Sequence, residues 1–398
     1  MTDAREADPA RPYPSKVTIV GTLPPLRAIS SYCEGLAVAQ AGHCDVEFFS
    51  FHALYPSFLY PGGALEDPHA AEPEADRLEI HRVLSWYNPF SWLAVGMRLR
   101  GQVLNLQWWS LPLAPVFITI ATVGRLRRIP VVTTVHNVAP HGRGTLVYRL
   151  LSGLLYRLSD RLIVHSENNR QQLKSRFDHV DQKTIVSPMG MADFARGRPT
   201  DKQQSRERLG LPTDRRILLM FGAVRGYKGL PDALHAMVEI SRERPETLLL
   251  VAGQAWDDAQ RYRDIVNELG LADHVKLDLR YIPERQIHHY FSAADLLLLP
   301  YTRFSAQSGA GTSALSYGLP VVTSNCGSLP ELVEDPASVI EPGDRRALAS
   351  RVIAILGNPD LYEKLASETS AIGRTRSWNR ISASLCAEYG KLVATEGE

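Results

Sequence analysis

Short apolar runs rich in β-branched residues alternate along the chain with longer segments in which apolar residues recur every three or four positions. The runs are typical of buried strands, and the longer segments are typical of amphipathic helices. This alternation predicts an α/β fold built from parallel βαβ units. The expected strands are residues 16–21, 46–51, 102–108, 130–136 and 161–166 in the first half, and residues 216–222, 247–253, 274–281, 295–301 and 320–325 in the second.

The expected helices lie between these strands. The uncharged run 101–124 divides into a strand, a turn and a helix that ends at Arg125–Arg128. A last amphipathic stretch, residues 378–393, follows the strands of the second half, and we expect it to pack back on the first. The remaining predicted helices are residues 28–40, 145–159, 167–177, 231–244, 258–269, 283–293, 310–317, 345–356 and 359–372.

A polar, basic segment near residues 190–215 separates the two halves and predicts a connection between domains. A chain of 398 residues is long enough for two domains of ordinary size. Two doubly wound sheets would present the carboxyl ends of their strands, where ligands bind, to a shared cleft. We therefore expect a disordered lead-in at residues 1–15, a first Rossmann-like domain at 16–195, a second at 196–376, and a terminal helix at 377–398 that packs on the first domain.

Charge and cysteine usage exclude several classes of function. The formal net charge of +1 argues against a nucleic-acid-binding protein, because such proteins carry a strong basic field. The four cysteines lie far apart with no Cys-x-x-Cys pair, which argues against a disulfide framework or a zinc site. The polar N-terminal residues resemble neither a secretory signal nor an anchor. Together these features predict free thiols and a cytoplasmic location.

Contact with the inner face of a membrane stays open as an alternative reading of the run 101–124. Pro112 and Pro115 argue against a continuous spanning helix. The flanking arginines could instead meet anionic headgroups, against the simpler reading of a buried strand and helix with solvated ends. The residues concerned are Arg98, Arg100, Arg125, Arg127 and Arg128, near Trp92, Trp108 and Trp109.

Two segments of the second half predict an anion site. Arg225 and Lys228 follow an apolar strand in the stretch LMFGAVRGYKGL, just before a helix whose start is marked by Pro231. Cations at a helix N-terminus repel the dipole there, unless an anion such as phosphate joins them. A second loop follows the strand at 295–301 and leads into the helix at 310–317. Its backbone amides from Ser308 to Thr312 would point outward toward the anion. The candidate ligand-binding residues of this loop are Gln307, Ser308, Gly309, Ala310, Gly311, Thr312 and Ser313.

In the first half, His136 and Asn137 end a strand, and His141 follows in the next loop. A lone histidine at such a position is more often structural than catalytic, but beside a phosphate site it becomes a candidate contact to the transferred group. The two histidines have no metal-ligand spacing, and the chain shows no Asp-x-Asp motif for a divalent ion beside a diphosphate. We therefore expect no metal and no cofactor, with charge neutralisation from Arg225, Lys228 and helix dipoles.

The chain resembles the family-4 glycosyltransferases, which are retaining enzymes of GT-B fold. The resemblance rests on FGAVRGYKGL, TVHNVAPH, LIVHSENNRQQL, YFSAADLLLLPY, ALSYGLPVV and GSLPELVED in the family's order. GTLPPLRAISSYCEGL and QWWSLP resemble a branch active in bacterial polysaccharide or glycolipid assembly. The resemblance implies a nucleotide-diphosphate sugar as donor and a saccharide or lipid-linked saccharide as acceptor.

By this resemblance, Arg225 and Lys228 would bind the donor diphosphate and His136 the sugar. Tyr281 and Ile282 would lie near the nucleobase, while Arg27 and Asn137 would lie on the acceptor side. The chain departs from the family at two positions. Many members carry a glutamate at each of them, and this chain has Ser305 and Ser313 instead. Serine keeps a hydrogen bond but lacks the charge and reach of glutamate.

This departure motivates a second hypothesis, a degenerate GT-B protein that binds nucleotide or glycan without transferring it. A phosphorylase or an epimerase of the same architecture is a third hypothesis.

Overall fold

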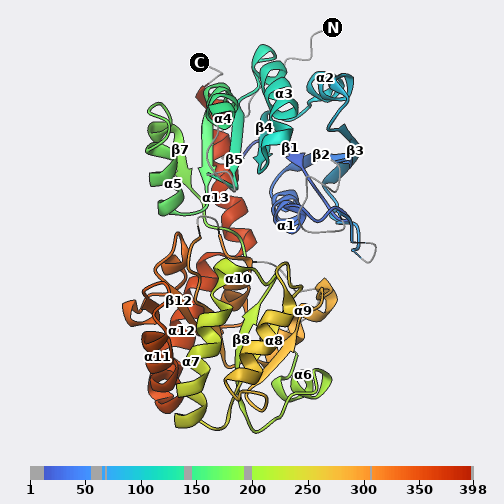
Figure 1. Ribbon diagram of the computed structural model, residues 1–398. Helices are drawn as coiled ribbons and strands as arrows, with labels where there is room; N and C mark the ends of the chain where they lie inside the picture. The colour runs from blue at the N-terminus through green and yellow to red at the C-terminus, as the bar shows by residue number, and fades with distance from the viewer. Residues whose placement is uncertain are drawn as a thin grey trace. The chain divides into compact units, whose positions relative to one another are not determined.

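The computed structural model describes residues 13–54, 65–67, 70–138, 146–191, 200–304 and 307–395. The chain forms two compact units, Met1–Gly190 with Ser377–Glu398, and Met191–Arg376. Each unit is built on one parallel sheet with helices on both faces (Figure 1). Within the described residues, no helix is both long and apolar enough to cross a membrane. The predicted lead-in lies almost entirely outside the described residues.

The first sheet has seven strands in the order β3-β2-β1-β4-β5-β6-β7. It contains all five strands predicted in this half. The two others escaped prediction because the edge strand β3, LEIHRVLS, interrupts its apolar residues with charged ones, and because β7 has only three residues. The strands are β1 (Lys16–Gly21), β2 (Asp45–Ala53), β3 (Leu78–Ser85), β4 (Val103–Trp108), β5 (Val131–Val135), β6 (Arg161–Val164) and β7 (Thr184–Val186).

Two apolar cores lie on opposite faces of this sheet. Successive strand residues point to opposite faces, so Ile19 of β1 enters one core and Val20 the other. Helices α2 (Pro89–Arg98), α3 (Ala114–Leu126), α4 (Leu146–Leu158) and α5 (Glu167–Lys174) cover one face. Helices α1 (Ser30–Ala41) and α13 (Trp378–Thr395) cover the other. Of these helices, only α2 had no sequence prediction.

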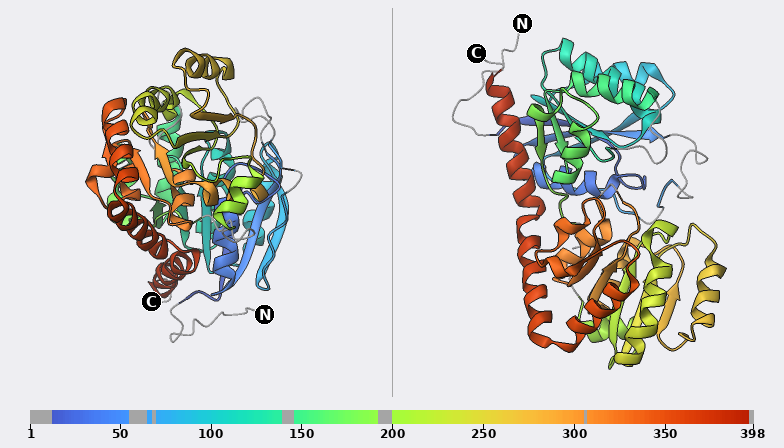
Figure 2. Two further views of the ribbon diagram at one scale, coloured as in Figure 1. Left: turned by 90° about the horizontal axis from the view of Figure 1, so that it is seen from below. Right: turned by 60° about the vertical axis from the view of Figure 1, so that its left-hand side comes forward.

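The last helix, α13, belongs to the first unit and packs against α1 (Figure 2). Its first residue, Trp378, is 8% exposed and occupies space that two glycines leave open. A Cβ atom on Gly35 would lie 2.3 Å from the Trp378 ring, and one on Gly190 would lie 2.4 Å from it. Any larger residue at either position would collide with the indole, so these glycines fix where α13 begins.

The second sheet has six strands in the order β10-β9-β8-β11-β12-β13. It contains the five predicted strands and the two-residue β13, which is too short to show a pattern. Helices α7, α8 and α11 pack on one face, and α9 and α10 on the other. The elements are β8 (Arg216–Phe221), α7 (Leu230–Glu243), β9 (Thr247–Ala252), α8 (Ala259–Glu268), β10 (Val275–Asp278), α9 (Glu284–Ala293), β11 (Leu296–Leu299), α10 (Gly309–Ser316), β12 (Val321–Ser324), β13 (Val339–Ile340), α11 (Arg345–Gly357) and α12 (Pro359–Thr375).

The segment predicted as a polar connection contains a helix, α6 (Lys202–Arg208), that packs on α9. Its Arg206 is 6% exposed and donates to the Asp295 carboxylate at 2.7 Å. Lys202 reaches the same carboxylate at 2.8 Å, and the Ile217 amide donates to it at 2.6 Å. A buried carboxylate before β11 thus holds a helix that has no apolar face, which explains why the hydrophobic pattern did not predict it.

Candidate functional site

The strand order of the second sheet marks one point where a ligand can bind. The chain runs from β8 through β9 to β10 in one direction, then returns and runs from β11 to β13 in the other. Helices leave the paired strands β8 and β11 toward opposite faces, which opens a crevice at their carboxyl ends. Arg225 and Lys228 follow β8, and Ser308 follows β11. The tertiary structure therefore places the two predicted anion-binding loops at the same sheet edge.

Backbone contacts join these two loops. The Thr302 amide donates to the Tyr227 carbonyl at 2.8 Å. Gly229, between the turn at Gly226–Lys228 and α7, has a φ of 72°. A Cβ atom there would lie 1.9 Å from the Pro300 carbonyl oxygen. Only glycine meets both conditions, so the position of Lys228 depends on this close approach.

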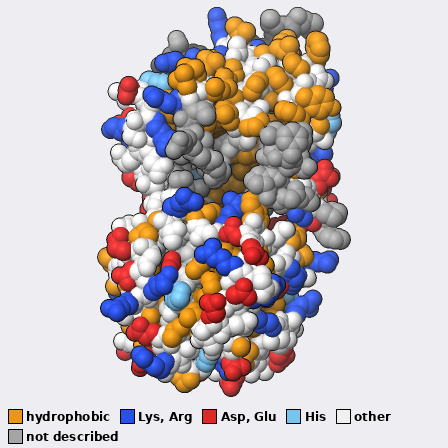
Figure 3. Space-filling model, viewed as in Figure 1, with side chains coloured by type: hydrophobic (Ala, Val, Ile, Leu, Met, Phe, Trp, Pro, Cys, Tyr) orange, Lys and Arg blue, Asp and Glu red, His pale blue; other side chains and the backbone are white. Residues whose placement is uncertain are grey.

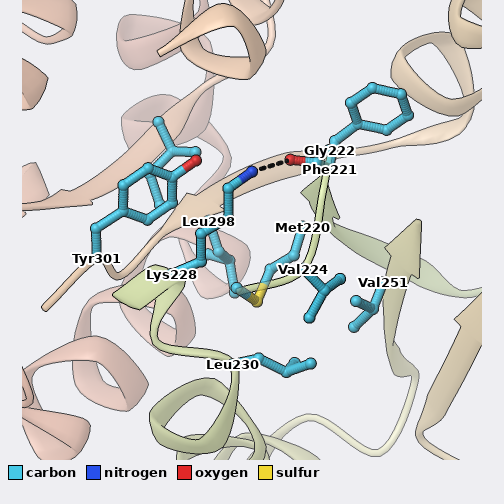
Figure 4. A pocket seen from close by; sticks show the side chains of 10 residues that line it. Met220, Phe221, Gly222, Val224, Lys228, Leu230, Val251, Leu298 and Tyr301 are labelled. Carbon is cyan, nitrogen blue, oxygen red and sulfur yellow. Dashed lines mark hydrogen bonds between the residues drawn. The ribbon is translucent and has the colours of Figure 1, made fainter. Parts of the chain in front are cut away.

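The Lys228 side chain lines a small apolar pocket, and its nitrogen points toward the backbone at Phe221 (Figure 4). Met220, Val251 and Leu298 are among the residues that line the pocket. The ammonium group donates to the Phe221 carbonyl at 3.2 Å and lies 5.5 Å from the centre of the Tyr301 ring. Burial, with a smaller contribution from the charge of Arg225, lowers the pKa of Lys228 to about 8. The cation is thus held where its charge is poorly solvated, and an anion would stabilise it.

Arg225 lies flat over an indole ring that the sequence analysis did not single out. Its guanidinium carbon is 3.4 Å from the centre of the Trp256 ring, in a cation–π contact. The Trp256 amide donates to the Val224 carbonyl at 2.9 Å, which ties the loop after β9 to the loop after β8. The Arg225 Nε atom is buried and has no hydrogen-bond partner among the described residues. Stacking on the indole orients the group and leaves donors for a ligand.

The start of α10 offers fewer amides than the sequence predicted. The Ser308 hydroxyl accepts from the Gly311 amide at 3.2 Å, and the Thr312 amide donates to the Ser308 carbonyl at 2.9 Å. These two amides are therefore used within the helix. Those of Gly309 and Ala310 have no backbone or side-chain acceptor among the described residues. The predicted anion contact through the amides of Ser308 to Thr312 thus loses two of its five donors.

The serine at one of the family's glutamate positions faces the protein interior. Ser313 is 2% exposed, and its hydroxyl donates to the Gly309 carbonyl at 2.7 Å. Its counterpart Ser305 lies outside the described residues. Gln307 is partly buried at the entrance to α10. Ser313 therefore braces the helix start, and it has no reach toward a ligand.

Tyr281 and Ile282 follow β10, two strands away from β8. Tyr281 is 40% exposed, whereas Ile282 is 6% exposed and packs in the apolar core. Tyr281 therefore offers a ring at this point, whereas Ile282 offers only its backbone, and that the two residues lie near a nucleobase stays a prediction.

The first sheet reverses direction between β1 and β4, and Arg27 follows β1 at that edge. Its amide donates to the Leu65 carbonyl at 2.8 Å. His136 directly follows β5, the next strand. Asn137 donates to the Trp109 carbonyl at 2.8 Å and accepts through its own carbonyl from Tyr148 at 2.9 Å. His141 lies outside the described residues.

Both ring nitrogens of His136 already have protein partners. Nε2 lies 2.9 Å from the Gln107 side-chain oxygen Oε1, and Nδ1 lies 3.2 Å from Nε2 of His165. The chain of contacts continues from Gln107 to Asn105 and from Asn105 to Tyr389 of α13. At its other end, His165 Nδ1 is 3.0 Å from the Ser187 carbonyl.

The Ser187 carbonyl fixes the direction of this network, because a carbonyl only accepts. His165 must donate to it through Nδ1, which leaves Nε2 of a neutral His165 to accept from Nδ1 of His136. The Gln107 atom that faces Nε2 of His136 is the oxygen Oε1, which only accepts, so a neutral His136 of this tautomer requires the Gln107 side-chain amide to turn and present its nitrogen as the donor. Burial lowers the pKa of His165 to about 4, and burial together with His165 lowers the pKa of His136 well below its usual value. Both rings are therefore neutral near pH 7, and His136 could meet a sugar through a nitrogen only by releasing one of its partners.

One group of metal-ligand side chains occurs among the described residues, near the amino ends of two strands and away from the carboxyl ends. Glu47, Glu79 and His81 offer donor atoms within 4.8 Å of one another on β2 and β3. Glu47 already accepts from the Thr18 hydroxyl at 3.0 Å, and Glu79 pairs with His81 at 3.2 Å. Both carboxylates thus have partners within the protein.

Known proteins resemble the chain in sequence. The family model "Glycosyl transferases group 1" matches residues 201–371. A D-inositol 3-phosphate glycosyltransferase of Actinosynnema mirum is 29% identical over 312 residues, 74% of this chain and 70% of that protein. The corresponding protein of Segniliparus rotundus is 27% identical over 275 residues, 66% of this chain and 61% of that protein. That match thus spans less than two thirds of the relative.

Solved structures resemble the whole chain in fold. Sucrose-phosphate synthase of Thermosynechococcus elongatus has a TM-score of 0.71 at 19% identity, over 96% of this chain and all of that one. Anabaena HepE in complex with UDP has a TM-score of 0.72 at 16% identity, over 94% of this chain and all of that one. The second unit therefore contains a glycosyl transferases group 1 domain, and the chain has the GT-B fold. The predicted fold class and the resemblance to glycosyltransferases are confirmed.

Proposed function

We propose that this protein transfers a sugar from a nucleotide-diphosphate donor to a hydroxyl of a saccharide or a lipid-linked saccharide. The observation that carries the proposal is the pair Arg225 and Lys228 at the switch point of the second sheet, inside the group 1 domain. Each charge-assisted hydrogen bond to phosphate contributes roughly 1.5–3 kcal/mol. Two cations and the amides of Gly309 and Ala310 suffice to hold a diphosphate without a metal ion.

The same groups would stabilise the charge that develops as the diphosphate departs. The bond between the sugar and the diphosphate breaks, a bond to the acceptor oxygen forms on the same face, and the acceptor proton passes to a phosphate oxygen. This route retains the anomeric configuration and requires no enzyme carboxylate as nucleophile. In this scheme, Lys228 and Arg225 act on the leaving group.

The acceptor-side roles of Arg27 and Asn137, and the sugar contact of His136, remain part of the proposal. Several relatives are named for D-inositol 3-phosphate, so a phosphorylated cyclitol belongs among the acceptors to be tested. Arg27 would suit an acceptor that carries a phosphate.

Thermal unfolding with UDP, GDP, ADP and dTDP tests donor binding. UDP-glucose should be the first sugar donor, because Anabaena HepE was solved in complex with it. A ligand at a hundred times its dissociation constant stabilises the folded state by roughly 2.7 kcal/mol, which raises the midpoint by several degrees. Product anomers from an active donor, analysed by NMR, test retention. If no nucleotide shifts the midpoint, or if Arg225→Ala turns the donor over within a few-fold of wild type, the proposal is wrong.

A second candidate, binding without transfer, draws on Ser313. Its buried hydroxyl, bonded to the Gly309 carbonyl, stands where the resemblance implies a donor-binding glutamate, and this candidate takes that donor contact to be missing. Nucleotide binding with neither transfer nor hydrolysis of the matching sugar donor, across the acceptor panel, would favour this candidate. Turnover by the purified chain alone would eliminate it.

A further inference from the structure

The outer face of α2, α3 and α4 carries most of the large apolar side chains that are exposed among the described residues. The three helices lie side by side, and their inner sides pack on the first sheet. Orange side chains gather over these helices in Figure 3. Of the thirteen large apolar residues exposed among those described, nine form what we call the apolar face: Tyr87, Phe90, Leu93, Met97, Leu126, Leu146, Val147, Leu150 and Leu154.

The spacing of these residues shows that the exposure is organised. On α4, Leu146, Leu150 and Leu154 recur every four residues along the outer side, while Tyr148 and Leu155 are buried against the core. On α2, Phe90, Leu93 and Met97 form a similar stripe, and Phe90 is 80% exposed. A helix with apolar residues on two opposite sides needs an apolar neighbour on each. The sheet provides the inner neighbour, and the described chain provides none outside.

The charge around this face is of one sign. Residues 80–159 contain nine Arg and no Asp or Glu, in a chain with 43 acidic residues. Arg125 pairs with Asp160, just beyond this segment, and Arg127 donates to the carbonyls of Gly96 and Met97 at 3.0 Å. Four exposed arginines, Arg98, Arg128, Arg149 and Arg157, have no carboxylate within 4 Å among the described residues.

We propose that the apolar face docks on the surface of an anionic lipid bilayer. Its leucine, phenylalanine and methionine side chains would enter the outer acyl region, and the unpaired arginines would meet lipid phosphates. A second copy of the chain fits this face less well. A symmetric contact would bring arginines against arginines, with no carboxylate in the segment to pair them. The proposal does not depend on the proposed function.

The structure changes which residues carry the membrane contact. Trp108 is 1% exposed and Trp109 is 8% exposed, so both belong to the core and neither can meet a lipid. The Trp92 indole donates to the Ser85 carbonyl at 2.6 Å and is partly buried. Aliphatic residues of α2 and α4, which the sequence analysis did not consider, take the place of the tryptophans.

Vesicle flotation of the full chain tests the proposal, with phosphatidylcholine vesicles and with vesicles that also contain phosphatidylglycerol. We expect the anionic vesicles to bind at least about ten times more protein, and binding to fall as salt rises, since headgroup attraction is screened. Leu150→Glu with Leu154→Glu should lower binding about tenfold or more, because two apolar anchors become charged. Arg149→Gln with Arg157→Gln should lower it several-fold and weaken its salt dependence.

Matched substitutions outside the face provide the controls. Val238→Glu changes an exposed apolar residue of α7 that is 44% exposed, and Arg242→Gln changes an exposed arginine of the same helix. Both variants should bind the vesicles as wild type does. Thermal unfolding should show that all variants fold. Equal binding to neutral and anionic vesicles would overturn the proposal, as would unchanged flotation of both double variants. A wild-type dimer that the glutamate variants split, without vesicle binding, would identify the face as an interface between copies.

Discussion

The carboxyl ends of the two sheets carry opposite kinds of polar chemistry. In the first unit, His136 and His165 belong to a hydrogen-bonded chain in which each ring nitrogen has a protein partner. In the second, Lys228 has one carbonyl as its partner, and the Nε atom of Arg225 has none among the described residues. Groups of the first kind stabilise the fold, whereas groups of the second kind are desolvated until a ligand joins them.

This difference predicts opposite costs for substitution. Loss of a member of the closed network should lower stability, because its former partners stay buried and unpaired. Loss of a poorly solvated cation should leave stability intact and weaken ligand binding.

The largest effect is expected at His165, which is 3% exposed. His165→Leu leaves the Ser187 carbonyl and a His136 nitrogen without partners, and about 1–3 kcal/mol for each orphaned group gives a loss of roughly 2–6 kcal/mol in unfolding free energy. Urea denaturation measures it. His179 is exposed, so the control substitution His179→Leu should change the unfolding free energy by less than about 0.5 kcal/mol. Similar losses at both positions would contradict a closed network.

Lys228→Met should give the next largest effect, on binding alone. It removes one charge-assisted contact worth roughly 1.5–3 kcal/mol, so calorimetry should show donor affinity falling about 10- to 150-fold. Unfolding free energy should stay constant or rise, because an apolar side chain replaces a poorly solvated cation. Lys276, which donates to the Leu209 and Gly210 carbonyls, provides the control. Lys276→Met should retain donor affinity. If Lys228→Met lowers the unfolding free energy but leaves donor affinity unchanged, Lys228 serves the fold and not the ligand.

The pH dependence of donor binding should be smaller, up to about tenfold between pH 7 and pH 9. The pKa of Lys228 is about 8 and should rise when the diphosphate binds, so a proton is taken up near pH 8. Calorimetry in two buffers of different ionisation enthalpy measures this uptake, which should disappear at pH 6 and in Lys228→Met. Without ligand, the unfolded chain binds this proton more tightly than the folded one, so this lysine's contribution to stability should rise between pH 8 and its unfolded pKa near 10.4. Uptake that persists in Lys228→Met would assign the proton to another group.

Trp256→Ala should have the smallest effect. A cation–π contact at a partly exposed site contributes about 0.5–1 kcal/mol, so the loss of Arg225 orientation should lower donor affinity about two- to fivefold. Trp256→Phe keeps an aromatic face and should recover most of the affinity. If the alanine and phenylalanine variants bind equally weakly, the indole acts through another contact.

The sequence predicted the strands wherever apolar residues form an unbroken run, as in Leu296–Leu299. It did not predict α6, because an ion pair between Arg206 and Asp295 holds that helix and their separation of 89 residues leaves no local pattern. Arg225 and Lys228 could be predicted from their position after a strand. Trp256, which contacts Arg225, could not be predicted, because it lies on a different loop and no local pattern links the two residues. The sequence correctly predicted a helix start near Ser308. The Ser308 hydroxyl, however, accepts from the Gly311 amide, which was expected to bind the anion.

The sequence by itself determined the α/β architecture, the order of its strands along the chain and the two loops that bear cations and small residues, because these follow from local periodicity and backbone preference. Only the tertiary structure decided which loops meet at one sheet edge, since strand order in a sheet depends on packing between distant segments. The tertiary structure also decided which polar groups pair with one another. Both ring nitrogens of His136 have partners, whereas Lys228 and Arg225 can still bind a ligand. Hydrogen bonds and ion pairs between distant residues make that distinction, and no single stretch of sequence contains both partners.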